Sequence, residues 1–228
     1  MAEWQTQGTQ NPPRATSCGF ESHFGHQKKS TDKVCAYSID EKDYVEFGLN
    51  EEDCPRASWA KYIFGVCREM QKRGLDHQAI GHGWTCEPYG VAGESWSRAD
   101  FATLPEDYRD AVAVLDGEKK LYSDVPLMTN LCYGRGDVRR RMVEAVADYC
   151  ASHPHVSAVH LWLSDGHNNF CECERCRDTH PADQYVTLLN EVDAELSARG
   201  IDTKIVFLAY FDLIFAPERE RLNNPDRF

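Results

Sequence analysis

The apolar residues between positions 55 and 210 follow helical spacing in some stretches and extended spacing in others. Four of them recur on one helix face: Trp59, Ile63, Val66 and Met70. This rhythm predicts a helix over 56–73, and Gly74 stands where that helix should end. Similar faces predict a second helix, capped by Asp137, and a third that Pro181 opens and Gly200 follows.

Apolar runs between these helices predict strands. One run ends at Gly81, and the others span residues 125–133, 156–163 and 204–210. A connection rich in Pro, Gly and Asp separates the first two runs at 87–124, with a weak helical pattern over 106–115. The alternation of helices with strands is typical of an α/β fold with a parallel sheet.

This α/β pattern predicts part of a (β/α) barrel of the TIM type, because each expected strand leads into a long loop. The Gly-rich phosphate turn of a Rossmann fold is absent from the sequence. A complete barrel needs about 250 residues, so we expect 54–228 to lack the C-terminal part of one. The remainder of a larger barrel or parent chain is then an expected partner. Residues 1–53 are polar and irregular, with a short strand at 34–39, and are interpreted as an extension or insertion.

Charge and composition exclude several classes of protein. The 228 residues carry 25 Lys and Arg against 37 Asp and Glu, a net charge of -12, which disfavours nucleic acid and anionic membranes as partners. No apolar stretch approaches the length of a membrane span, and residues 1–5 lack the pattern of a secretory signal. We therefore expect a cytoplasmic protein as the sequence stands, and an exported one if the true N-terminus is missing.

Clustered cysteines give the strongest chemical signal. Cys171, Cys173 and Cys176 lie within six positions, and His180 follows, so three thiolates and an imidazole could surround one structural Zn²⁺. His167 is a rival fourth ligand. The alternative is three reduced surface cysteines that happen to cluster. A zinc ion with four protein ligands would hold the loop rather than catalyse, and no organic cofactor is expected.

Polar and aromatic residues follow the expected strands, where barrels place their functional groups. The candidate substrate-binding residues are His82, Trp84, Asn130, Tyr133, His167 and Tyr210. Asp165 and Glu87 are the candidate catalytic carboxylates. The alternatives are a turn-forming role for Asp165 before Gly166, a solvated loop position for Glu87 and a core position for Trp84.

One segment resembles a known family. Leu161–Gly166 leads into Phe170–Cys176, and Asp183–Tyr185 and Leu189–Val192 follow. This run resembles the uncharacterised bacterial proteins grouped as domain of unknown function 4838, and the similarity extends over 56–228. The resemblance implies a glycoside-hydrolase-type (β/α) barrel and a carbohydrate context, but it supplies neither a reaction nor catalytic residues.

These observations together predict a glycoside-hydrolase-like protein that acts on a polysaccharide or oligosaccharide by carboxylate acid/base hydrolysis. The alternative is a module without catalysis, either carbohydrate-binding or a zinc-stabilised structural unit. No nucleophile elbow, Walker A sequence, set of kinase motifs or H-E-x-x-H sequence is present, which excludes the common hydrolases, kinases and metalloproteases that carry them.

Overall fold

The computed structural model describes residues 20–21, 33–38, 42–48, 50–75, 78–79, 81–93, 96–154 and 156–228. The chain forms two compact units, 1–71 and 72–228. The boundary between the units lies later than the 53/54 boundary expected from composition. Helix α1 explains the difference, since its apolar residues pack against a strand of the first unit.

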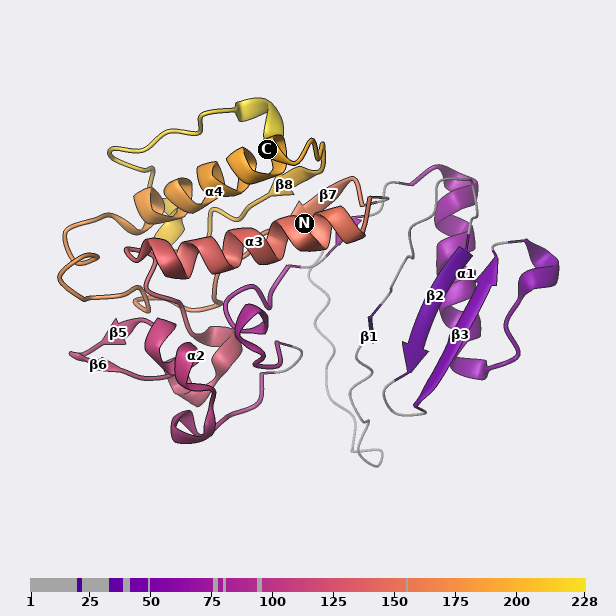
Figure 1. Cartoon of the computed structure of the whole chain (residues 1–228), viewed down its shortest axis with the longest axis horizontal. Coiled ribbons are helices and arrows are strands. Elements are labelled where there is room, and N and C mark those ends of the chain that lie inside the picture. Colours follow the sequence, from indigo (N-terminus) through magenta and orange to yellow (C-terminus); the bar gives the residue numbers. More distant parts are fainter. Residues whose placement is uncertain are drawn as a thin grey trace. The chain divides into compact units, whose positions relative to one another are not determined.

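An antiparallel sheet and a helix make up the described part of the first unit (Figure 1). Strands β1 (Phe20–Glu21), β2 (Lys33–Ser38) and β3 (Asp43–Gly48) pair in sequence order. A short 3-10 turn, η1 (Glu51–Asp53), leads to α1 (Ser58–Arg73), which confirms the helix predicted at 56–73. The small core consists of one strand residue and three helix residues: Phe47, Ala60, Ile63 and Phe64.

A parallel sheet lies at the centre of the second unit. Strands β4 (Gln78–Ala79), β7 (Ala158–His160) and β8 (Lys204–Val206) are arranged in the order β4-β7-β8. Val159 pairs with Ala79 on one side and with Ile205 on the other. The parallel α/β prediction is therefore confirmed. Within the described residues this sheet has three strands and does not close into a barrel.

The prediction of a strand at 125–133 is wrong. That segment contains η5 (Pro126–Met128), preceded by η4 (Tyr122–Asp124). Ser123 and Asp124 have positive φ angles, 53° and 61°, and Pro126 has no N–H to give to a ladder, so the chain turns instead of extending. With no strand here, β4 pairs directly with β7.

The rest of the 87–124 connection consists of short elements. These are η2 (Glu87–Tyr89), η3 (Phe101–Thr103), α2 (Glu106–Ala111), β5 (Val114–Leu115) and β6 (Glu118–Lys119). Strands β5 and β6 form a hairpin whose turn residues, Asp116 and Gly117, both have positive φ, as tight hairpin turns require. Two further 3-10 turns follow β8, namely η6 (Phe211–Ile214) and η7 (Pro225–Arg227).

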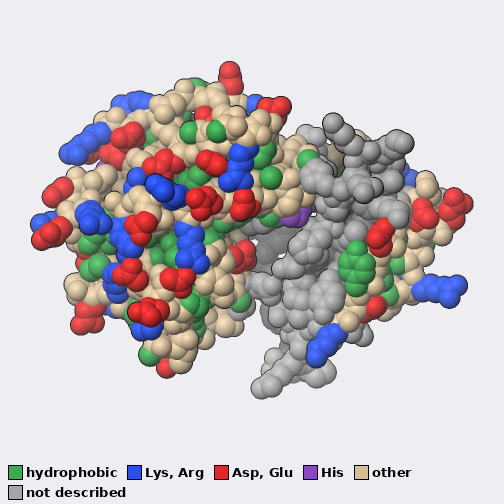
Figure 2. All heavy atoms as spheres, in the orientation of Figure 1, with side chains coloured by type: hydrophobic (Ala, Val, Ile, Leu, Met, Phe, Trp, Pro, Cys, Tyr) green, Lys and Arg blue, Asp and Glu red, His purple; other side chains and the backbone are tan. Residues whose placement is uncertain are grey.

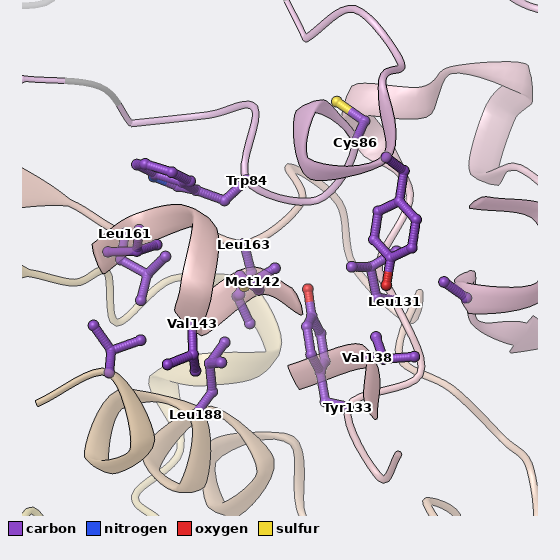
Figure 3. Close-up of a cluster of buried hydrophobic side chains, with 14 of the residues drawn as sticks. Trp84, Cys86, Leu131, Tyr133, Val138, Met142, Val143, Leu161, Leu163 and Leu188 are labelled. Carbon is purple, nitrogen blue, oxygen red and sulfur yellow. The ribbon is translucent and has the colours of Figure 1, made fainter. Parts of the chain in front are cut away.

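Helices α3 (Gly136–Ser152) and α4 (Pro181–Ala198) lie side by side and confirm the two predicted helices of the second unit (Figure 1). Their apolar faces share one core with the central strand of the parallel sheet. Fully buried members include Met142 from α3, Leu188 from α4 and Leu161 just after β7 (Figure 3). Val146 and Leu189 are buried in the same core.

Charges of both signs are mixed on the face of the second unit seen in Figure 2. Arg139 pairs with Glu191 at 2.8 Å, and Arg141 pairs with Asp107 at 2.7 Å and lies over the Tyr89 ring. Two of the three arginines in the basic run at 139–141 therefore take part in ion pairs. None of the helices in the described part of the chain has the length and apolar character needed to cross a membrane.

Candidate metal centre and adjacent pocket

Four cysteine side chains meet in the second unit. The sulfur atoms of Cys132, Cys171, Cys173 and Cys176 all lie within 4.8 Å of one another. The sulfur of Cys132 is 3.7 Å from that of Cys173 and 3.8 Å from that of Cys176. Cys173 is half-buried and the other three are buried. Four thiols at this spacing could bind a metal ion.

Local backbone geometry brings the cysteines together. The N–H of Val114 in β5 donates to the Cys171 sulfur at 3.3 Å, and the N–H of Glu172 donates to the Val114 carbonyl. The N–H groups of Cys176 and Arg177 both donate to the Cys173 carbonyl, which folds the C-x₂-C segment into a tight turn. The cysteine loop is therefore fastened to the β5–β6 hairpin.

Gly134 allows Cys132 and Cys176 to approach each other. A Cβ atom at this position would lie 2.6 Å from the Cys176 sulfur, closer than such atoms come in proteins. The N–H of Arg135 also donates to the Cys132 carbonyl at 3.0 Å, which closes a turn around the glycine. Only a residue without a side chain fits there.

The fourth cysteine replaces the predicted histidine. His180 caps α4 instead, and its Nδ1 accepts a hydrogen bond from the N–H of Ala182 at 3.2 Å. His167, the rival ligand, is exposed and its ring stands edge-on to Phe211. Sequence reasoning missed Cys132 because it lay inside the run interpreted as a strand. The signal that could have found it is the Cys-Tyr-Gly turn at 132–134.

The pKa values of the clustered thiols are shifted in different directions. The pKa of Cys171 is lowered because the thiols of Cys132 and Cys176 and the N–H of Val114 all donate to its sulfur. The pKa of Cys132 is raised to about 12, first because its S–H donates to the Cys171 sulfur. Hydrogen bonds from its thiol to Cys132 and Cys171 raise the pKa of Cys176, and burial raises it further. A cation among the four sulfurs would replace these protons and neutralise the thiolates that would otherwise repel one another.

A pocket of about 180 Å³ opens at the carboxyl ends of the parallel strands. Its polar lining comes from all three: His82 follows β4, Ser164 and Asp165 follow β7, and Tyr210 and Asp212 follow β8. Phe170 and three leucines add apolar walls. Three of the predicted site residues, His82, Asp165 and Tyr210, are therefore brought together, as expected for residues at the same edge of a parallel sheet.

Hydrogen bonds connect the groups of this pocket. The Tyr210 hydroxyl donates to Asp165, and the pKa of Tyr210 is raised first by removal from water and then by that carboxylate. Asp212 accepts a hydrogen bond from the Asn168 N–H at 2.6 Å, which ties the loop after β8 to the loop after β7. The pocket thus has two carboxylates on loops that support each other.

Two predicted substrate-binding residues belong to the core. Trp84 is 4% exposed, and its Nε1 donates to the His160 carbonyl at 2.8 Å. Tyr133 is 1% exposed, and its hydroxyl donates to Asn130 Oδ1 at 3.1 Å. Both rings lie among aliphatic side chains in Figure 3. Because large aromatic rings contribute most of their stabilisation when buried, these positions are occupied for packing.

Asn130 lies beneath the pocket and is fully buried. Its Nδ2 donates to Asn169 Oδ1 at 2.9 Å, and its Oδ1 accepts from the Ser164 N–H at 3.3 Å. Asn169 in turn donates to Ser164 Oγ at 2.7 Å. Asn130 therefore supports the pocket loop from below and does not reach a solute.

Glu87 lies apart from the lining of the pocket. It begins η2, is exposed, and its carboxylate covers Gly83 and Gly93, where a Cβ atom would come within 2.7 Å of Oε1. The predicted Asp165–Glu87 pair is therefore not gathered around this cavity. Asp212, two positions after Tyr210, lines it instead.

No protein-family profile matches the sequence, and comparisons with curated proteins and with solved structures likewise gave no match.

Proposed function

We propose that residues 72–228 form a zinc-stabilised domain that binds a carbohydrate in the pocket beside β7 and hydrolyses its glycosidic bond. One observation supports this combination. The loop after β7 supplies three of the four clustered cysteines and also Ser164 and Asp165 of the pocket. A metal that holds this loop would therefore hold one wall of the pocket.

The sulfur separations support zinc as the ion. Four sulfurs at a Zn–S distance of about 2.3 Å in a tetrahedron lie about 3.8 Å apart. The Cys132 sulfur is already 3.7 Å and 3.8 Å from two of its neighbours. Four thiolate ligands favour zinc over the hard cations, which prefer oxygen. A closed Cys₄ site has no open position for water, so its role is structural.

The pocket chemistry supports a sugar ligand. Carboxylate, imidazole and hydroxyl groups can bond sugar hydroxyls, and the rings of Phe170 and Tyr210 can stack on a pyranose face. Its volume is below the roughly 300–1,000 Å³ of pockets for drug-sized ligands, which suits a single ring at the end of a chain. Two carboxylates in one pocket are what acid/base glycoside hydrolysis requires.

Two measurements test the proposal. Native mass spectrometry of the reduced protein, purified without added metal, should show one zinc per chain. A panel of 4-methylumbelliferyl glycosides of neutral sugars should reveal turnover that Asp165→Asn abolishes while binding of the free sugar persists. Sugar binding without turnover of any panel member would instead indicate the non-catalytic carbohydrate-binding alternative. Bound zinc with neither sugar binding nor turnover would indicate a structural module.

A further inference from the structure

We infer that Asp212, rather than Glu87, is the carboxylate that works with Asp165, and that the pocket accepts neutral glycosides in preference to acidic ones. This inference rests on the proposed hydrolytic function. Asp165 and Asp212 line one cavity on loops that follow neighbouring strands, β7 and β8. Glu87 covers Gly83 and Gly93 instead and is not part of that lining.

Hydrogen bonds hold both carboxylates in place. The Asn168 N–H donates to Asp212 Oδ2 at 2.6 Å, and the Tyr210 hydroxyl donates to Asp165. A backbone donor and a side chain on the adjacent loop thus orient the two groups before a ligand enters. Such preorganisation is what catalytic carboxylates need, since misplacement by about 1 Å costs roughly 100-fold in rate.

His82 adds an imidazole ring to the wall of the pocket. Its Nδ1 is buried and has no hydrogen-bond partner within the part of the chain that the structure describes. The imidazole lines the same cavity and is held edge-on by Trp162 and Trp96, with ring centroids 5.1 Å and 5.4 Å away. Packing between the two indole rings therefore fixes the imidazole at the edge of the cavity.

The charge of the pocket selects its substrate. Two carboxylates line it, and no lysine or arginine is among the described residues of the lining. A uronic acid or a phosphate ester would bring further negative charge beside the ionised carboxylate in a partly enclosed space, which like-charge repulsion disfavours. A neutral glycoside avoids that repulsion.

The reaction consumes one water molecule. One carboxyl group, protonated, gives its proton to the glycosidic oxygen as the bond from that oxygen to C1 breaks. In a single displacement the other, ionised, takes a proton from the water whose oxygen forms the new bond to C1. In a double displacement it bonds to C1 instead, and the first carboxyl group, now ionised, takes a proton from the water that displaces it from C1. The products are a reducing sugar and the freed alcohol, and the two carboxyl groups together regain their starting number of protons.

Kinetics on four forms of the full chain test this inference: wild type, Asp165→Asn, Asp212→Asn and Glu87→Gln. The probes are 4-methylumbelliferyl glycosides of neutral hexoses, with the glucuronide and the phosphate as acidic comparisons. We expect both aspartate variants to lose at least about 100-fold in kcat and Glu87→Gln to stay within about threefold of wild type. The acidic probes should turn over at least about tenfold more slowly.

Chemical rescue distinguishes a loss of catalysis from a loss of folding in these variants. Sodium azide should restore turnover in one of Asp165→Ala and Asp212→Ala, because a small anion can replace a missing base or nucleophile only in a folded site. Turnover that survives Asp212→Asn but disappears in Glu87→Gln would overturn the inference and leave the proposed hydrolysis standing. A wild-type protein without turnover on every probe would overturn the proposed function, and this inference with it.

Discussion

The sulfur atoms of Cys132 and Cys176 lie 3.8 Å apart although 44 positions separate the two residues in the chain. Helix α3 and strand β7 both lie between them in sequence. A metal bound by both cysteines would therefore close a long loop, and closing long loops restricts the unfolded chain most. Such a metal would cross-link the second unit and would also support the pocket.

Replacing the fourth cysteine should release the metal. Cys132→Ser leaves three thiolates, so we expect less than about 0.2 zinc per chain by native mass spectrometry. Losing a ligand that occupies its site at about 100 times its Kd costs about 2.7 kcal/mol, which lowers the Tm of a chain this size by roughly 5–11 °C. His180→Ala is the matched control and should keep one zinc. Zinc lost from His180→Ala but kept by Cys132→Ser would contradict the Cys₄ assignment.

A methyl group at position 134 should disturb the same centre. The Cβ of Gly134→Ala would lie 2.6 Å from the Cys176 sulfur, so that cysteine must shift and the sulfurs lose their spacing. We expect zinc affinity, measured by competition with a chromogenic chelator, to fall at least about tenfold. Gly136→Ala is the control, since its Cβ meets only the Arg139 side chain, at 3.9 Å. Equal affinities in the two variants would refute this explanation of Gly134.

The buried ion pair between Arg227 and Asp193 should be costly to break. The guanidinium donates to Asp193 at 2.7 Å and also to the carbonyls of Ile201 and Thr203, and both residues are less than 10% exposed. Removing one partner leaves the other charge buried and unpaired, which typically lowers the free energy of unfolding by about 3–5 kcal/mol. We therefore expect Arg227→Met to lower the Tm strongly in a thermal melt followed by circular dichroism.

Two further variants complete that test. Asp193→Leu combined with Arg227→Met removes both charges and should recover much of the lost stability. Arg177→Met changes an exposed arginine that stands 3.9 Å from Asp178, so its effect should stay below about 1 kcal/mol. A double variant no more stable than Arg227→Met alone would contradict the explanation from an unpaired buried charge.

Arg135 should control the titration of Asp137. The pKa of Asp137 is lowered to about 2, first by its hydrogen bond with Arg135, and the pKa of Asp110 is lowered by Lys119 and Arg135. Because these folded-state values lie below the ordinary 3.8, the stabilisation is present above about pH 4 and is lost as pH falls toward 2. Both carboxylates are largely exposed, so the effect on stability is small.

Carboxyl chemical shifts give the direct measurement. Titration by NMR should place the pKa of Asp137 near 2 in the wild type and closer to 3.8 in Arg135→Gln. The difference in Tm between these two proteins should narrow as pH falls from 4 to 2. Arg177→Gln, which removes a different arginine, should leave the Asp137 titration unchanged. An unchanged titration in Arg135→Gln would contradict the hydrogen-bond origin of the shift.

Local patterns were enough to predict the three long helices. Periodicity and end signals such as Pro181 and Gly200 act within a few turns of the chain, so α1, α3 and α4 begin and end close to the predicted residues. The prediction of a strand at 125–133 failed because an apolar run alone does not distinguish a strand from a series of buried turns. Pro126 was the residue that indicated the turns.

The sequence by itself determined the α/β alternation, the convergence of Cys171, Cys173 and Cys176, and the grouping of His82, Asp165 and Tyr210 at strand ends. These features follow from local spacing and from the rule that parallel strands share one carboxyl edge. Only the tertiary structure decided that Cys132 joins the cluster, that Asp212 lines the pocket and that Trp84 and Tyr133 are core. Such contacts depend on which distant segments pack together. The burial of apolar surface across the whole unit decides that packing, and the neighbours of a residue in the chain do not.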